Sequence, residues 1–209
     1  MAFSRWSANS NAIYARGGEK MQAKESALSV DNVVASALAR AGDKGRMKAH
    51  WRIEKYLGDF KQASDIPKDL KPYDVVEFAG NVLLHEGINE LWTLVCGTGA
   101  TQFSNAAAYM GVGDSATAAD ATQTGLQAVT NKLYKAMDTS YPTYGSSQKA
   151  TWRATFGADD ANFHWQEITV ANGNSDAAKN LNRKVQDMGT KPSEAPGSTW
   201  VATLEITLS

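Results

Sequence analysis

The feature that most restricts the fold of this chain is a change in its hydrophobic period near residue 100. Downstream of it, apolar residues alternate with polar ones along residues 150–156 and again along residues 199–208. A period of two is typical of strands that bury one face and expose the other. The apolar sets are Ala150, Trp152, Ala154 and Phe156 on the first strand, and Trp200, Ala202, Leu204, Ile206 and Leu208 on the second.

Four shorter strands are predicted between these limits. They occupy residues 108–112, 132–137, 163–170 and 181–185, and Gly, Asn and Pro residues typical of turns separate them. Several short strands joined by such turns indicate an antiparallel β-sandwich. The fold class is therefore predicted to be mainly β.

Residues 1–72 are predicted to form an extended, partly helical N-terminal arm. Residues 30–41 carry an apolar stripe at helical spacing, and two prolines mark residues 65–72 as a linker. A second amphipathic segment is suggested by Met47, Trp51, Tyr56 and Phe60. Because such short helices are marginal alone, we expect the arm to become ordered only against a partner.

Residues 73–209 are predicted to form a helix followed by the β-sandwich. The helix is expected over residues 74–96, with apolar residues on one broad face that covers the core. That face includes Val82, Leu84, His85, Ile88, Leu91, Trp92 and Val95. The single cysteine, Cys96, is interpreted as a small buried hydrophobe.

The charge of the chain is nearly balanced, at a formal net −1, which gives no global signal for nucleic acid or for an anionic membrane. Basic residues gather locally at Lys44, Arg46, Lys48, Arg52 and Lys55. A basic arm lying on an acidic neighbour and a solvated basic face both fit this cluster. No apolar run approaches the about 18 residues of a membrane-spanning helix, and no signal segment is visible, so a cytosolic origin is expected.

No motif predicts catalysis. The histidines His50, His85 and His164 belong to three different elements, without the spacing of metal ligands. Residues 111–115 lack the helix and the Lys-Ser/Thr pair of a phosphate loop, and Asp159-Asp160 lacks the alternating ligands of a calcium loop. We therefore expect a protein that is not an enzyme and that has no catalytic residues, no metal and no cofactor.

Several blocks downstream of Asn81 resemble a known family. They read GINELW at residues 87–92, AYMGVGDS at 108–115, TQTGLQA at 122–128, TWRATF at 151–156 and FHWQE at 163–167, with further matches at 96–99, 181–185, 197–200 and 208–209. In these blocks the sequence is similar to a family of structural proteins of tailed-bacteriophage virions. The resemblance implies a virion component with a β-sandwich or jelly-roll-like domain and carries over no catalytic residues.

Two functions follow as expectations. The first is a capsid decoration (cement) protein that binds and stabilises neighbouring capsid subunits through its arm. The alternative is a tail- or fibre-associated attachment or receptor-binding protein. A virion-borne depolymerase is a distant third, because no paired carboxylates stand out. In each case the protein would be assembled in the host cytoplasm and end in the virion.

The partner contacts are expected in the arm, which has large rings but no core of its own. Such rings are the usual energetic centre of an interface, while basic groups add orientation. The predicted contact residues are Trp6, Arg46, Lys48, Trp51, Arg52, Tyr56 and Phe60. The expected partners are the major capsid protein or other virion proteins and further copies of the chain, a trimer included, with no nucleic acid and no membrane.

Overall fold

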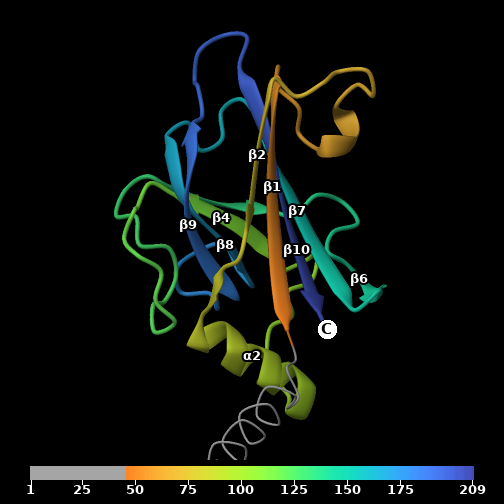
Figure 1. Cartoon of the computed structure of the whole chain (residues 1–209), viewed down its shortest axis with the longest axis vertical. Coiled ribbons are helices and arrows are strands. Elements are labelled where there is room, and N and C mark those ends of the chain that lie inside the picture. The colour runs from red at the N-terminus through yellow and green to blue at the C-terminus, as the bar shows by residue number, and fades with distance from the viewer. Residues whose placement is uncertain (1–45) are drawn as a thin grey trace, which may run out of the picture. The chain divides into compact units, whose positions relative to one another are not determined.

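The computed structural model describes residues 46–209 of the chain (Figure 1). The chain divides into one unit of residues 1–45 and a second of residues 46–209. Predictions made for Trp6 and for the apolar stripe at residues 30–41 lie outside the described residues.

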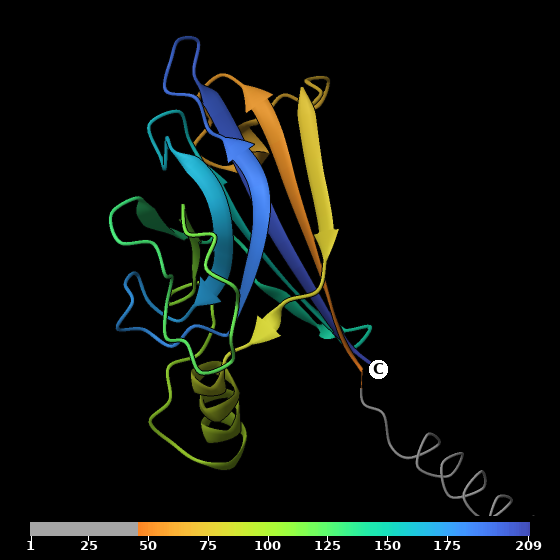
Figure 2. The ribbon, with the colours of Figure 1, turned by 60° about the vertical axis from the view of Figure 1, so that its left-hand side comes forward.

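The described unit consists mainly of two five-stranded antiparallel sheets. The first has the order β2 (Asp74–Ala79), β1 (Met47–Leu57), β10 (Ser198–Leu208), β7 (Lys149–Phe156) and β6 (Thr143–Ser146). The second has the order β3 (Val82–Leu83), β9 (Asn182–Thr190), β8 (His164–Ala171), β4 (Tyr109–Gly113) and β5 (Lys132–Ala136). A short 3-10 turn, η1 (Ala63–Asp65), and one α-helix, α2 (His85–Cys96), complete it. The sheets form two layers of a β-sandwich (Figure 2), which confirms the mainly β prediction.

Aromatic rings from both sheets meet in the core. The Trp165 ring on β8 makes edge-to-face contacts with Phe156 on β7, at 4.7 Å between centroids, and with Trp200 on β10, at 4.8 Å. Both indole N–H groups are satisfied, since Trp165 donates to the Ala161 carbonyl and Trp200 to the Ser198 hydroxyl. The residues predicted to face inward are buried from Trp152 to Phe156 on β7 and from Trp200 to Ile206 on β10, which confirms the predicted orientation of these strands.

Residues 47–57 form strand β1 of the sandwich, which corrects the prediction of a helix in an arm. β1 pairs with β10 from Met47 opposite Leu208 to Leu57 opposite Ser198, and with β2 on its other side. Residues Trp51 and Ile53 are fully buried in the core. The predicted domain boundary at residue 72 was therefore too late, because the first strand lies before the linker.

The helix predicted over residues 74–96 is also corrected. Its first part is strand β2, whose run of Val75 and Val76 favours an extended backbone, and only α2 is helical. Gly80, at φ +79°, provides the turn between β2 and β3. Cys96, at the end of α2, is exposed and not buried as expected.

Helix α2 is held unusually close to the chain just before β9. A Cβ atom added at Gly87 would lie 2.5 Å from the Leu181 Cα and 2.6 Å from the Asn180 carbonyl oxygen. Both neighbours are backbone atoms, so they cannot rotate away. Because Gly87 has no side chain, α2 can lie this close to the backbone of Asn180 and Leu181.

We expect Gly87→Ala to destabilise the protein by about 2 kcal/mol, through overpacking against this backbone. In a free helix the same change would stabilise by about 1 kcal/mol. Urea unfolding measures the sign of the change in the free energy of unfolding. The control is Asn89→Ala, at an exposed position of the same helix, which reports the effect of helix propensity alone. A more stable Gly87→Ala protein would contradict the close packing of α2.

Candidate functional site

Helix α2 turns its acidic side chains toward the sandwich. The Glu86 carboxylate accepts a hydrogen bond from the backbone N–H of Asn180 at 3.0 Å. The Glu90 carboxylate accepts from the backbone N–H of Thr101 at 2.8 Å and from the Asn172 side-chain amide at 2.9 Å. These bonds to charged acceptors fix the rotation of the helix about its axis.

The opposite side of α2 presents apolar side chains to solvent. Leu91, Trp92 and Val95 are 39%, 62% and 74% exposed, and we call these three residues the apolar ridge. The sequence correctly placed them on one helical face, but the expectation that this face covers the core was wrong. The reason is that Gly87, Glu86 and Glu90 take the inner side of the helix.

An apolar groove lies beside the ridge, with a volume of about 820 Å³. Its walls come from α2, from the beginning of β1, from the end of β10 and from the β6–β7 hairpin, and they include Met47, Leu94, Phe103, Tyr144, Trp152 and Leu208. Figure 1 shows α2 at the end of the sandwich where β10 finishes. We call the ridge and the groove together the apolar end surface.

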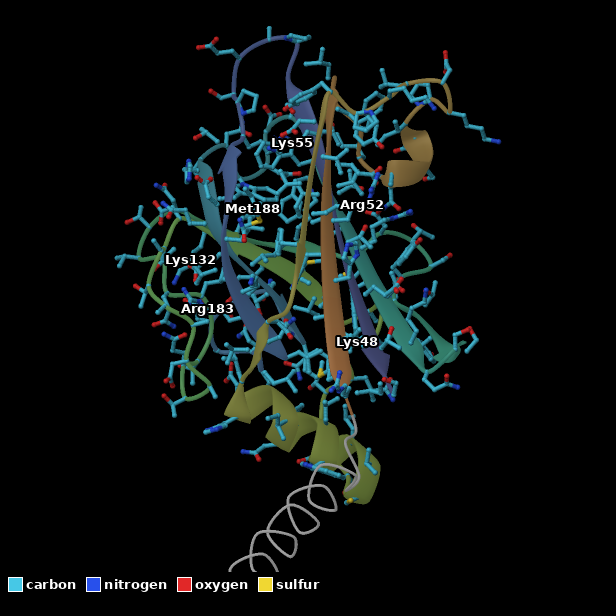
Figure 3. The ribbon with its side chains drawn as sticks, in the orientation of Figure 1. Lys48, Arg52, Lys55, Lys132, Arg183 and Met188 are labelled. Carbon is cyan, nitrogen blue, oxygen red and sulfur yellow. The ribbon has the colours of Figure 1, made fainter. Side chains whose placement is uncertain are left out.

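Two basic residues lie at the start of β1, but neither Arg46 nor Lys48 lines the groove. Lys48 lines a separate hollow together with His50, Glu205 and Thr207. Arg46 and Lys48 are exposed at the start of β1, and neither forms an ion pair within residues 46–209. Figure 3 shows Lys48 at the end of β1 nearest α2. A third cation, Lys149, is paired with Glu205 at 2.8 Å. The uncompensated charge contributed by β1 at this end is thus basic.

The other predicted contact residues lie elsewhere. The Trp51 ring is buried and stacks with Phe78 at 6.2 Å between centroids, and Tyr56 is 9% exposed. The expectation that these rings have no core of their own was therefore wrong. Phe60 is half-buried in the chain after β1, where its backbone N–H donates to the Thr199 hydroxyl.

Arg52 has its own carboxylates within the first sheet. Its guanidinium is 3.0 Å from Glu54 and also contacts Glu77 on the neighbouring strand β2. The hydrogen bond to Glu54 raises the pKa of Arg52, with Glu77 adding to the effect. Of the predicted contact residues that the structure describes, none lines the groove of the apolar end surface, although Arg46 and Lys48 flank Met47, which does.

Comparison with known proteins gives no relative for this chain. No protein-family model, no curated protein and no solved structure matches it.

The buried basic residue Lys191 is satisfied inside the sandwich. The Lys191 ammonium donates to the carbonyl oxygens of Gly157 and Ala158 and to the Asn162 side-chain oxygen, at 2.7, 3.2 and 2.8 Å. Burial lowers the pKa of Lys191 to about 8. Because these oxygens belong to the turn between β7 and β8, the bonds tie this turn to the end of β9.

Neither a metal site nor a spanning helix is present in the described part of the chain. Residues 46–209 contain no group of three or more His, Cys, Asp or Glu side chains placed to hold a metal ion. Over the same range, no helix has both the length and the apolar character needed to cross a membrane. The exposed side chains of Leu91, Trp92 and Val95 beside an apolar groove make the apolar end surface the candidate functional site.

Proposed function

We propose that this protein is a structural component of a bacteriophage virion, a capsid decoration (cement) protein that stabilises neighbouring capsid subunits. The sequence resemblance from residue 81 onward supports the virion assignment. The observation that carries the binding role is the apolar end surface. Leu91, Trp92 and Val95 are exposed together beside the groove, and exposed apolar side chains that gather in one place often mark interaction sites.

The ridge is suited to binding because it is already formed in the single chain. The bonds of Glu86 and Glu90 and the contact of Gly87 hold α2, so little side-chain or backbone order is lost on association. A large aromatic ring such as Trp92 is a frequent hot spot in interfaces. The proposed contact thus moves from the rings of β1 to this surface.

The remaining parts of the proposal concern assembly. The proposed partners are the major capsid protein or other virion proteins, and the chain would also associate with itself into a trimer or another oligomer. The protein would be assembled in the host cytoplasm and act in the virion without catalysis. Pairing of the first described strand, β1, with the last, β10, is compatible with the jelly-roll-like connectivity that the resemblance implies. An arm, reduced here to residues 1–45, would add to the contact.

A second candidate is a tail- or fibre-associated attachment or receptor-binding protein. It is favoured by the β6–β7 hairpin, where the Tyr144 ring is 76% exposed near the polar residues 146–148. An exposed aromatic face next to hydroxyl and amide groups suits a host glycan. Copy number separates the two: a number close to that of the capsid subunits favours cement, and a few copies favour the tail.

We expect Trp92→Glu to lower binding to particles that lack the native protein by at least about tenfold, since truncation of a central aromatic ring typically costs about 2 kcal/mol or more. Stability should not change, because the ring is exposed. Co-sedimentation measures occupancy, and Val129→Glu, at a residue that is 91% exposed, is the matched control. Normal occupancy by the Trp92→Glu protein would remove the apolar end surface from the proposal.

A further inference from the structure

We propose that Lys191 and Asn162 form an intramolecular isopeptide bond, in which the Lys191 side-chain nitrogen replaces the amide nitrogen of the Asn162 side chain and ammonia is lost. Lys191 directly follows β9, and Asn162 lies in the turn between β7 and β8. The bond would join the two ends of the β8–β9 hairpin that its own turn leaves apart, beside the pair of His164 and Thr190. This inference is independent of the proposed function.

The Lys191 amine is held in contact with the Asn162 carboxamide. Lys191 is 1% exposed, and its Nζ lies 2.8 Å from the Asn162 Oδ1. The backbone N–H of Lys191 also donates to the Phe163 carbonyl at 3.1 Å, so the two segments are paired up to this point. The Asn162 Cγ is one C=O bond, about 1.2 Å, from Oδ1, which places it within about 4 Å of Nζ. Reacting atoms in a near-attack geometry are roughly 3–3.5 Å apart, so a small rotation of the carboxamide suffices.

Two backbone carbonyls orient the attacking nitrogen. The carbonyl oxygens of Gly157 and Ala158 accept hydrogen bonds from the Lys191 Nζ at 2.7 and 3.2 Å. A neutral amine has two N–H groups and one lone pair, and these two carbonyls accept both hydrogens. The lone pair is then left for the third direction, which points to the Asn162 carboxamide. An amine with a free lone pair is the nucleophilic form of lysine.

The surroundings of Lys191 favour this neutral form. Burial lowers the pKa of Lys191 to about 8, and Lys135 adds to the lowering, whereas the carboxylates of Asp160, Asp159 and Asp59 oppose it. About a tenth of the molecules therefore carry the neutral amine at pH 7. This fraction grows as the pH rises through the pKa, so the bond should form faster in mild alkali.

The reaction needs no further reagent. The Lys191 Nζ attacks the Asn162 Cγ and a new C–N bond forms, one proton passes from Nζ to the Asn162 Nδ2, and the Cγ–Nδ2 bond breaks to release ammonia. The two nitrogens are neighbours, since Nδ2 donates at 2.7 Å to the same Ala158 carbonyl that accepts from Nζ. The proton thus has a short path from the attacking nitrogen to the leaving one.

The turn that carries Asn162 has an uncommon backbone conformation. Ala161 has a φ of +50°, in the left-handed region that residues other than glycine rarely adopt. This conformation is held by the Ala161 carbonyl, which accepts from the Trp165 indole N–H at 2.9 Å and from the Phe163 N–H at 2.8 Å. Strained positions that the surrounding structure fixes in this way are frequent at functional sites.

The bond would give the chain a permanent cross-link that does not depend on oxidation. Cys96 is the single cysteine, so no disulfide can form within the chain. A ring closed between Asn162 and Lys191 restricts the unfolded chain as a disulfide does, and reducing conditions leave it intact.

Mass spectrometry of the full chain tests the inference. After incubation of the folded protein at pH 9, the denatured chain should be lighter by one ammonia molecule, and the half-time should be at least about tenfold longer at pH 6, where little amine is neutral. Trypsin should then release residues 154–179 and 185–209 as one branched peptide, because the bond leaves the cleavage sites around both segments free. Fragmentation of this peptide should locate the bond at Asn162 and Lys191.

Variants and an alternative product sharpen the test. Lys191→Met and Asn162→Ala should each keep the full mass, whereas Lys184→Met, the matched control on β9, should lose ammonia like wild type. Because the branched peptide is read in the wild-type chain, the result does not depend on whether the variants fold.

Two results would overturn the inference. One is a folded wild-type chain that keeps its full mass at pH 9, which would leave Lys191 a purely structural ammonium. The other is a loss of ammonia without a branched peptide, which would assign the loss to a succinimide at the Asn172-Gly173 sequence.

Discussion

Removal of residues 1–60 is expected to abolish folding of the sandwich, whereas removal of residues 1–45 should leave it folded. The longer deletion takes away β1, which pairs with β10 along all of its 11 residues and also with β2. It removes Trp51 and Ile53 from the core, each worth several kcal/mol when truncated singly. Since a domain is stable by only about 5–15 kcal/mol, this loss exceeds what it can tolerate.

Thermal unfolding followed by near-UV circular dichroism checks the pair of deletions. A chain that begins at Arg46 should unfold cooperatively, as the full chain does, because residues 46–209 contain both sheets and their core. A chain that begins after residue 60 should show no cooperative transition. If it folded cooperatively, β1 would be dispensable, and the sequence-based expectation of a separable arm up to residue 72 would be restored.

Replacement of Arg183 by methionine is expected to destabilise the protein by about 3–5 kcal/mol, because it leaves a buried carboxylate without its cation. The Arg183 Nε lies 2.6 Å from the Glu167 carboxylate, and both side chains are fully buried. Glu167 also accepts from the backbone N–H groups of Gln127 and Ala128, at 3.0 and 2.7 Å. Two amide donors alone do not compensate a buried negative charge.

Chemical denaturation of single and double variants separates the charge from the shape. The Arg183→Met, Glu167→Met double variant should recover much of the loss, since apolar pairs often replace buried ion pairs with little cost. Lys184→Met, at the adjacent partly exposed position on β9, controls for the change of residue type. A loss below about 1 kcal/mol for Arg183→Met would mean that the ion pair between Arg183 and Glu167 contributes little to stability.

The strands that the sequence predicted share strict alternation. In residues 152–156 and 200–206 every residue of the predicted inward phase is buried, and Thr155 and Val201 on the opposite phase are buried as well. Strand β1 was missed because Met47 and Trp51 are four residues apart. Residues at this spacing lie on the same face of a helix and also on the same face of a strand. Ala49, between them, is also buried, and it is the residue that favours the strand.

The candidate site was predicted less well, because its orientation depends on distant residues. The set of Leu91, Trp92 and Val95 was recognised as one face, but the side on which α2 packs is decided by the partners of Glu86 and Glu90. Those partners come from loops near residues 101, 172 and 180, so no local pattern contains them. One local signal was present: two glutamates four residues apart share a helical side with Gly87, the residue that permits close approach.

The central strands are long enough to make the sandwich a spacer between its two ends. β1 and β10 each contain 11 residues, and at about 3.4 Å per residue they separate the two ends of the sandwich by roughly 35 Å. The turn between β9 and β10 lies at the end opposite α2 (Figure 1). A partner bound at the apolar end surface would therefore lie one domain length from this turn. In an assembly that binds the protein through that surface, the turn would form the outermost layer.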